Sequence, residues 1–118
     1  LPYTPPDNAE RPARSYILEE IKDGMLVETH AIPRTKTFFV FGRLPMCDFP
    51  MDHQSISRYH CVLQFAASNH TTLVDLGSSH GTFVNKQQIR PSTPRTLDIG
   101  DQIRFGMSTR TWCLGTTD

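Results

Sequence analysis

The sequence predicts an all-β domain, a sandwich or barrel of mostly antiparallel strands. Short apolar segments recur at short intervals, and clusters of Gly, Asn, Ser and Pro separate them. Short strands punctuated in this way are typical of sandwiches and barrels. No stretch combines a helical apolar period with capping residues. The strands that we expect lie at 15–22, 25–32, 37–42, 60–65, 71–76, 82–85, 95–99, 101–106 and 110–115.

The first two of these segments are expected to form a hairpin. SYILEEIK and MLVETHAI flank Asp23-Gly24, a dipeptide that tight turns between antiparallel strands prefer. The run TFFVFG at 37–42 is apolar throughout, which favours a buried strand. HCVLQF at 60–65 alternates in part and so presents one apolar face. The later segments are short, and turn residues bound each of them.

Length and composition indicate one globular domain. The chain has 118 residues, of which 37% are hydrophobic and 20% charged, and its formal net charge is zero. A disordered chain would be more charged and less aromatic, and a whole-surface binder of nucleic acid or membrane would be clearly basic. Residues 1–14 hold four prolines and few apolar side chains, which predicts a flexible proline-rich tail. The domain itself is expected at 15–118.

The three cysteines, Cys47, Cys61 and Cys113, lie far apart in the sequence, and no CxxC or HxxxH spacing appears. An odd number of separated thiols predicts neither a disulfide framework nor a structural zinc site. We therefore expect reduced thiols, and neither a metal nor any other cofactor.

The first loop of chemical interest begins where the 37–42 strand ends. Arg43 follows Gly42 there, and its guanidinium would present a fork of donors that suits a carboxylate or a phosphate. An exposed or ion-paired arginine without a ligand is the simpler interpretation of a single Gly-Arg pair.

A hydroxyl, a second guanidinium and an imidazole come just before the 60–65 strand. Ser57 can donate to a phosphate oxygen, and Arg58 can add positive charge beside it. His60 opens the apolar strand, so we expect its ring to be buried and to hold the loop through a fixed hydrogen bond.

The second loop of interest lies within DLGSSHGTFVN at 75–85. Gly77 and Gly81 permit positive φ and a close approach of the backbone. Ser78, Ser79 and the N–H groups between the glycines can bind an anion. The same composition also describes an ordinary β-turn, which is the simpler interpretation of this loop taken alone.

Ser57, His60 and Asp75 are the residue types of a hydrolase triad, but their pattern does not support one. Ser57 lacks the G-x-S-x-G elbow, and a Ser–His pair three positions apart in a loop has no reason to aim the imidazole at Oγ. The phosphate-loop sequence GxxxxGK[ST] is also absent. We therefore expect no enzyme and no catalytic residue.

Several short motifs occur in a fixed order along the chain. They are Gly42-Arg43, Cys47-Asp48, Ser55-x-Ser57-Arg58-x-His60, Leu63, Asp75-Leu76-Gly77-Ser78, Gly81-Thr82-Phe83-Val84-Asn85 and TLDIGDQIRFG. In this order and with these gaps the chain resembles a forkhead-associated (FHA) domain, over 40–115, with 15–39 supplying the first strands. The resemblance implies a β-sandwich of about eleven strands in two sheets, whose loops at one end bind phosphothreonine peptides.

The resemblance also implies roles for single residues. Arg43 and Ser57 match the residues that hold the phosphate. Arg58 matches a variable contact residue, and Ser79 matches a position that contacts phosphate or peptide backbone. The positions that match loop-shaping residues of the family are Gly42, His60, Gly81 and Asn85.

His80 departs from the family pattern, because many members carry Asn before Gly-Thr and that Asn contacts the peptide main chain. We still place His80 in the binding site, with hydrogen bonds that depend on its tautomer. The departure leaves an alternative function open: a phosphate-independent interaction or structural domain with a degenerate pocket.

The function that we predict is a module that docks a phosphothreonine-containing protein or peptide. A phosphothreonine carries a charge of about −1.5 to −2, and one cationic pocket in a neutral protein would bind it without general affinity for polyanions. We expect a monomer that binds neither membrane nor nucleic acid directly. A finer resemblance, to a nuclear member of the family, implies a nuclear location, with the cytoplasm as a second one.

Overall fold

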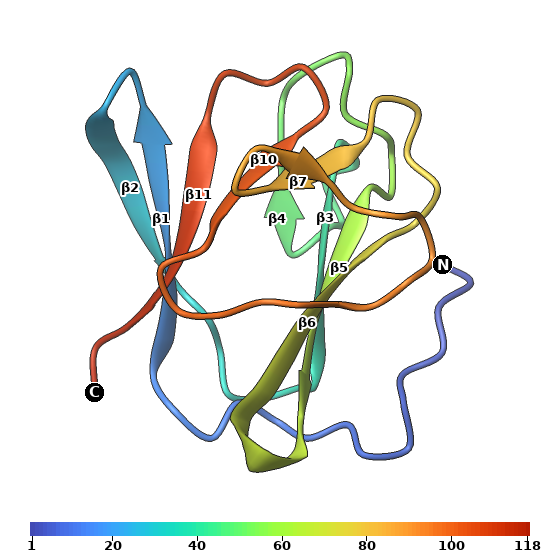
Figure 1. Ribbon diagram of the computed structural model, residues 1–118, viewed down its shortest axis with the longest axis vertical. Coiled ribbons are helices and arrows are strands. Elements are labelled where there is room, and N and C mark those ends of the chain that lie inside the picture. Colours follow the sequence, from blue (N-terminus) through green and yellow to red (C-terminus); the bar gives the residue numbers. More distant parts are fainter.

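The fold is a sandwich of two β-sheets, described over all of residues 1–118 in a computed structural model (Figure 1). The strands are β1 (Tyr16–Lys22), β2 (Met25–Ala31), β3 (Phe38–Gly42), β4 (Phe49–Pro50), β5 (Cys61–Ala66), β6 (His70–Asp75), β7 (Thr82–Val84), β8 (Gln87–Gln88), β9 (Arg95–Thr96), β10 (Gln102–Phe105) and β11 (Thr111–Thr116). The only helical element is a 3-10 turn at Ala67–Asn69, and no helix is long and apolar enough to span a membrane.

Six strands form the first sheet, in the order β2-β1-β11-β10-β7-β8, and five form the second, in the order β4-β3-β5-β6-β9. Every pairing with an assigned register is antiparallel except that of β3 with β4. The predicted fold class, an all-β sandwich of about eleven mostly antiparallel strands, is therefore confirmed. Sequence reasoning missed only β4 and β8, which have two residues each and are too short to show an apolar period.

The turn chemistry and the apolar runs explain the elements that surround the site. Asp23 and Gly24 have φ values of 52° and 74°, as the tight turn of the β1–β2 hairpin requires. β3 lacks alternation because both of its faces are covered. Phe39 and Phe41 belong to the core between the sheets, whereas Val40 packs in a second cluster on the opposite face.

Aromatic rings join the two sheets beneath the loop end of the sandwich. The Phe41 ring of β3 stacks on Phe105 of β10 with 4.7 Å between centroids, and on Phe49 of β4 with 5.0 Å. Trp112 of β11 meets the same group edge-on. Burying one such side chain contributes roughly 1.5–3 kcal/mol. Because Phe41 directly precedes Gly42, this packing fixes the point from which the first loop leaves the sheet.

The N-terminal segment lies against the second sheet, in contrast to the flexible tail that its composition predicts for 1–14. Ala9 pairs with Ala66 at the end of β5. The Tyr3 hydroxyl donates to Gln64 Oε1 across 2.6 Å. A cavity of about 530 Å³ remains between this segment and the sheet. The difference arises because backbone hydrogen bonds and one tyrosine make the contacts, and neither leaves a periodic apolar signal.

Candidate functional site

The two loops that carry the predicted binding residues meet at one end of the sandwich. β3 and β6 both end there and β5 begins there, at the top of the domain in Figure 1. The Ser79 N–H donates to Ser57 Oγ across 3.1 Å, and the Leu76 N–H donates to the His60 carbonyl across 3.0 Å. The structure thus brings 43–59 and 76–81 into direct contact.

Arg43 is the first residue of its loop and is exposed. Its backbone N–H donates to the Ser57 carbonyl and its Nε–H to the Ile56 carbonyl, each across 3.0 Å. No protein group bonds its terminal guanidinium nitrogens. One anchored N–H therefore fixes the fork and leaves the remaining donors directed at solvent, which is the arrangement that an arginine needs to receive an anion.

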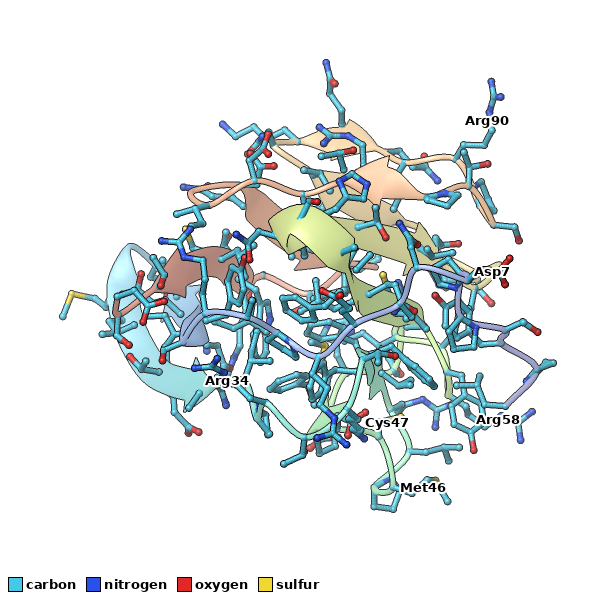
Figure 2. The ribbon with its side chains drawn as sticks, turned by 90° about the horizontal axis from the view of Figure 1, so that it is seen from below. Asp7, Arg34, Met46, Cys47, Arg58 and Arg90 are labelled. Atoms are coloured by element: carbon cyan, nitrogen blue, oxygen red, sulfur yellow. The ribbon has the colours of Figure 1, made fainter.

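Ser57, Arg58 and Ser79 supply further hydrogen-bond donors from the same two loops. Ser57 Oγ accepts the Ser79 N–H, so its own hydroxyl hydrogen stays free to donate. Arg58 is exposed, and its side chain has no hydrogen-bond or ion-pair partner in the protein. Figure 2 shows Arg58 at the edge of the domain. The group offers several donors and no carboxylate, which suits an oxyanion.

His60 links the two loops from inside. Its ring is fully buried, Nδ1 accepts the Ser57 N–H across 3.1 Å, and Nε2 lies 2.8 Å from the Gly81 carbonyl. The ring therefore carries its proton on Nε2 and donates to Gly81. Both nitrogens are occupied by backbone groups, so neither faces Ser57 Oγ. Asp75 Oδ1 lies 4.0 Å from Nε2.

Burial lowers the pKa of His60, and the Gly81 carbonyl and the Asp75 carboxylate offset only part of this effect. We expect the domain to lose stability as the pH falls below about 6.5, the ordinary histidine value, because the unfolded chain then binds a proton that the folded ring resists. Above that pH the contribution is fully present. Urea unfolding at about pH 7.5 and about pH 5.5 measures this loss of stability. If the unfolding free energy of a His60→Gln variant changes with pH as much as that of wild type, His60 is not the cause of the pH dependence.

Asp75 organises the second loop, a role that sequence reasoning missed. Its Oδ2 accepts the N–H groups of Gly77 and Ser78, each across 3.0 Å. Its Oδ1 accepts the hydroxyls of Ser78 at 2.6 Å and Thr82 at 2.7 Å. Burial alone would raise the pKa of Asp75, but these donors outweigh it and hold the pKa below its ordinary value. The local signal was the Asp-x-Gly-Ser sequence, which is typical of an Asx turn.

Gly42 and Gly81 are required where the backbone leaves no room. A Cβ on Gly42 would lie 2.1 Å from the Arg58 carbonyl oxygen and 2.8 Å from Cys47 Sγ. Gly81 has a φ of +85°, and the end of the Gln88 side chain lies 2.6 Å from where its Cβ would be. Its carbonyl accepts the N–H of Gly106 as well as that of the His60 ring.

We expect Gly42→Ala to destabilise the domain by at least about 2 kcal/mol and to weaken ligand binding, because the new methyl must push the Arg58 carbonyl and the binding loop outward. Gly24→Ala is the matched control. It meets no atom within 4 Å at its distant hairpin, so it should add backbone strain only and leave binding unchanged. Thermal unfolding and peptide titration of both variants decide the matter, and Gly42→Ala behaving like wild type would contradict it.

The structure separates Asn85 from the other predicted residues. It lies beyond β7, where its Nδ2 donates to Asp101 and its Oδ1 accepts the Gln102 N–H, each across 3.0 Å. Asn85 therefore shapes the turn into β8, and its side chain forms no hydrogen bond to the 43–59 or 76–81 loops. His80 lies beside Ser79 on the exposed loop, and no protein group bonds its ring.

Nothing in residues 1–118 marks a metal site. No group of three or more His, Cys, Asp or Glu side chains is placed to hold an ion. The three cysteines are free thiols. Two cavities, of about 530 and 550 Å³, are lined by neither Arg43 nor Ser57, although Met51, His53 and Ile56 of the 43–59 loop border the second. The site is defined here by its hydrogen-bond donors.

Comparisons with known proteins identify a family model, relatives and solved structures that are similar to this chain. The family model described as FHA domain matches residues 39–106. Human kanadaptin is 40% identical, over 96% of this chain and 16% of that protein. This confirms the finer resemblance to kanadaptin that PYTPP, GTFVNKQQI and IRFGMSTR predict. The human nuclear inhibitor of protein phosphatase 1 is 37% identical, over 92% of this chain and 31% of that protein. The chain thus spans less than a third of the length of these relatives.

Solved structures show the same architecture. The FHA domain of TbPar42 is 30% identical with a TM-score of 0.78, over 98% of this chain and 65% of that chain. A chain from a structural and functional analysis of phosphothreonine-dependent FHA domain interactions has a TM-score of 0.71 at 22% identity, over 88% of this chain and 98% of that chain. This second likeness shows the fold alone. From the family match, the identities and the fold together, the chain belongs to the FHA domain family.

Proposed function

We propose that the domain binds a phosphothreonine segment of a partner protein between the loops at 43–59 and 76–81. The observation that carries this proposal is the anchored guanidinium of Arg43, whose Nε–H bonds the Ile56 carbonyl while its terminal nitrogens stay free. Ser57 adds a hydroxyl beside it. A phosphate has three strong acceptor oxygens, and these donors match them, while the one carboxylate under the second loop, that of Asp75, is buried and hydrogen-bonded to the loop itself.

The remaining predicted residues have subordinate roles in the proposal. Arg58 adds positive charge from the edge of the site, and Ser79 offers its hydroxyl to the phosphate or to the peptide backbone. His80 faces the peptide with both ring nitrogens unbonded, so it can donate or accept. His60 and Gly81 act indirectly, because they fix the loops on which the contacting groups lie.

The family and the relatives favour an interaction module over an enzyme. One relative is named as an inhibitor of protein phosphatase 1, and that name describes a regulator. The same relative is named as nuclear, which supports a nuclear partner and location for this chain. The proposed partner is accordingly a nuclear protein phosphorylated on threonine.

A phosphothreonine-oriented peptide library tests the proposal. The wild-type domain should retain phosphothreonine peptides and release their unphosphorylated counterparts, and Arg43→Ala should retain neither. If the wild-type domain retains phosphorylated and unphosphorylated peptides equally, the proposal is wrong and the chain is a phosphate-independent interaction domain.

We expect binding to depend only moderately on salt. One phosphate held by one or two arginines involves few charges, and the zero net charge of the chain gives little long-range steering. Affinity for a phosphothreonine peptide should fall by less than about tenfold between 50 and 200 mM salt, whereas a protein that contacts many phosphates loses about 10³–10⁵. Calorimetry across this range measures the slope. A steep loss would indicate a polyanionic partner such as RNA.

A further inference from the structure

The chain contains two Thr-Pro pairs, and the proposed binding site uses neither of them. Thr4-Pro5 lies in the N-terminal segment, and Thr93-Pro94 lies in the connection between β8 and β9. Residues 90–94 are all exposed and belong to no strand. The Thr93 hydroxyl bonds only the Pro91 carbonyl, two residues earlier, across 3.2 Å. Thr93 therefore presents its hydroxyl at the surface, directly before a proline.

The segment around Thr93 is attached to the domain by few contacts. The Ser92 N–H donates to the Asp75 carbonyl and the Leu97 N–H to the Thr71 carbonyl, each across 2.8 Å. Between these two bonds, β9 pairs with β6 through only two residues, at the edge of the second sheet. A short edge strand with an exposed loop before it opens locally while the rest of a domain stays folded. The segment can therefore extend into the cleft of a modifying enzyme.

The surroundings of Thr93 carry positive charge and no carboxylate. Residues 76–97 contain no Asp or Glu, and Arg90 and Arg95 flank Thr93. A hollow of about 290 Å³ is lined by Thr93, by both arginines and by no acidic residue. Neither arginine forms an ion pair, and the Arg95 guanidinium bonds only the Thr96 carbonyl. Two guanidiniums without an acidic partner thus border the hollow that Thr93 lines.

We propose that Thr93 is a phosphorylation site for a proline-directed kinase, and that Arg90 and Arg95 hold its phosphate in this hollow. In the reaction, Thr93 Oγ1 attacks the γ-phosphorus of ATP, the bond from that phosphorus to the β,γ-bridging oxygen breaks and ADP leaves. The hydroxyl proton passes to the catalytic base of the kinase. Pro94 lacks a backbone N–H, which is the property that such kinases select in the residue after the acceptor.

The phosphate matches the hollow in charge and in size. It carries a charge of about −1.5 to −2 and three acceptor oxygens, and guanidinium forks bind such oxygens in charge-assisted pairs. The volume of about 290 Å³ exceeds several-fold the roughly 30 Å³ that one water molecule occupies, so the hollow has room for a phosphate group. Neither Arg43 nor Ser57 lines it. The modification site is therefore separate from the proposed peptide site and does not depend on it.

A purified mitogen-activated protein kinase with ATP, followed by mass spectrometry of proteolytic fragments, tests the modification. We expect phosphate on Thr93 of the full chain. Thr93→Ala and Pro94→Ala should abolish it, whereas Ser92→Ala should keep it, because Ser92 does not precede a proline. A synthetic peptide covering 88–98 reports the sequence preference of the kinase without the fold. If Thr93 is phosphorylated in neither the chain nor the peptide, or in the peptide alone, the site is overturned.

Phosphorus NMR of the phosphorylated chain tests where the phosphate lies. The second pKa of a phosphothreonine is about 6, and two nearby guanidiniums favour the dianion. The titration midpoint should therefore be at least about 0.3 pH unit lower in the folded chain than in the phosphorylated 88–98 peptide. Arg90→Gln and Arg95→Gln should each raise this midpoint, whereas Arg34→Gln, on the opposite side of the domain in Figure 2, should not. A midpoint equal to that of the peptide, or unchanged in both the Arg90 and Arg95 variants, would overturn the role of the two arginines.

Discussion

Arg43→Ala is expected to abolish phosphopeptide binding and to leave the fold intact. The residue is exposed and the only hydrogen bond of its side chain within the protein runs from Nε to the Ile56 carbonyl, so its removal costs little stability. The bound peptide, in contrast, loses the proposed bidentate, charge-assisted hydrogen bonds between its phosphate and the guanidinium. Truncating such a partner costs on the order of 2–4 kcal/mol, which corresponds to about 30- to 1,000-fold in the dissociation constant. Calorimetry with a bound phosphothreonine peptide measures the loss.

Two further variants separate the geometry of Arg43 from its charge. Arg43→Lys keeps the charge but loses the fork and the bond to the Ile56 carbonyl, so its affinity should be intermediate. Arg34→Ala is the matched control. Arg34 is another exposed arginine whose guanidinium bonds backbone carbonyls, those of Pro12 and Ala13, but it lies near the N-terminal segment. Its removal should not affect binding. A folded Arg43→Ala variant with an unchanged dissociation constant would remove Arg43 from the phosphate site.

His60→Ala is expected to act mainly on stability. The ring is fully buried, and its two hydrogen bonds connect the Ser57 N–H to the Gly81 carbonyl across the two loops. Its loss leaves a cavity beside Phe105, whose ring it meets edge-on at 5.6 Å. It also leaves the Ser57 N–H without a partner. Cavity formation and unpaired buried groups together cost about 3–5 kcal/mol of unfolding free energy. Weaker binding should follow as the loops loosen.

Thermal and urea unfolding measure the effect of His60→Ala, with His70→Ala as the control because that side chain is exposed at the start of β6. The control should unfold like wild type. A His60→Ala variant that unfolds like wild type and yet binds no peptide would show that the ring contacts the ligand directly, contrary to its buried position.

The long strands were predictable because local chemistry specifies them. Asp23-Gly24 predicts a hairpin, and the apolar run that ends at Gly42 predicts a buried strand. The packing of the N-terminal segment was not predictable in this way. It depends on the pairing of Ala9 with Ala66 and on the Tyr3–Gln64 bond, and both join positions more than fifty residues apart. Backbone pairing of this kind leaves no trace in a side-chain pattern.

The same distinction applies to the site. Arg43, Ser57 and Ser79 stand out as donor side chains in loops, and the structure adds which of their groups are already bonded and which are free. Asp75 carries a local turn signal, but its bond to Thr82 depends on how β7 leaves the loop.

The most direct test is a calorimetric titration of the domain with three forms of one library-selected peptide, carrying phosphothreonine, phosphoserine or threonine. We expect the phosphothreonine form to bind at least about 30-fold more tightly than the threonine form, because in the proposed site Arg43 and Ser57 contact the phosphate. The phosphoserine form should bind about fourfold more weakly than phosphothreonine, if its missing methyl is worth about 0.8 kcal/mol. Equal affinities for the phosphothreonine and threonine forms would contradict phosphate recognition by this site.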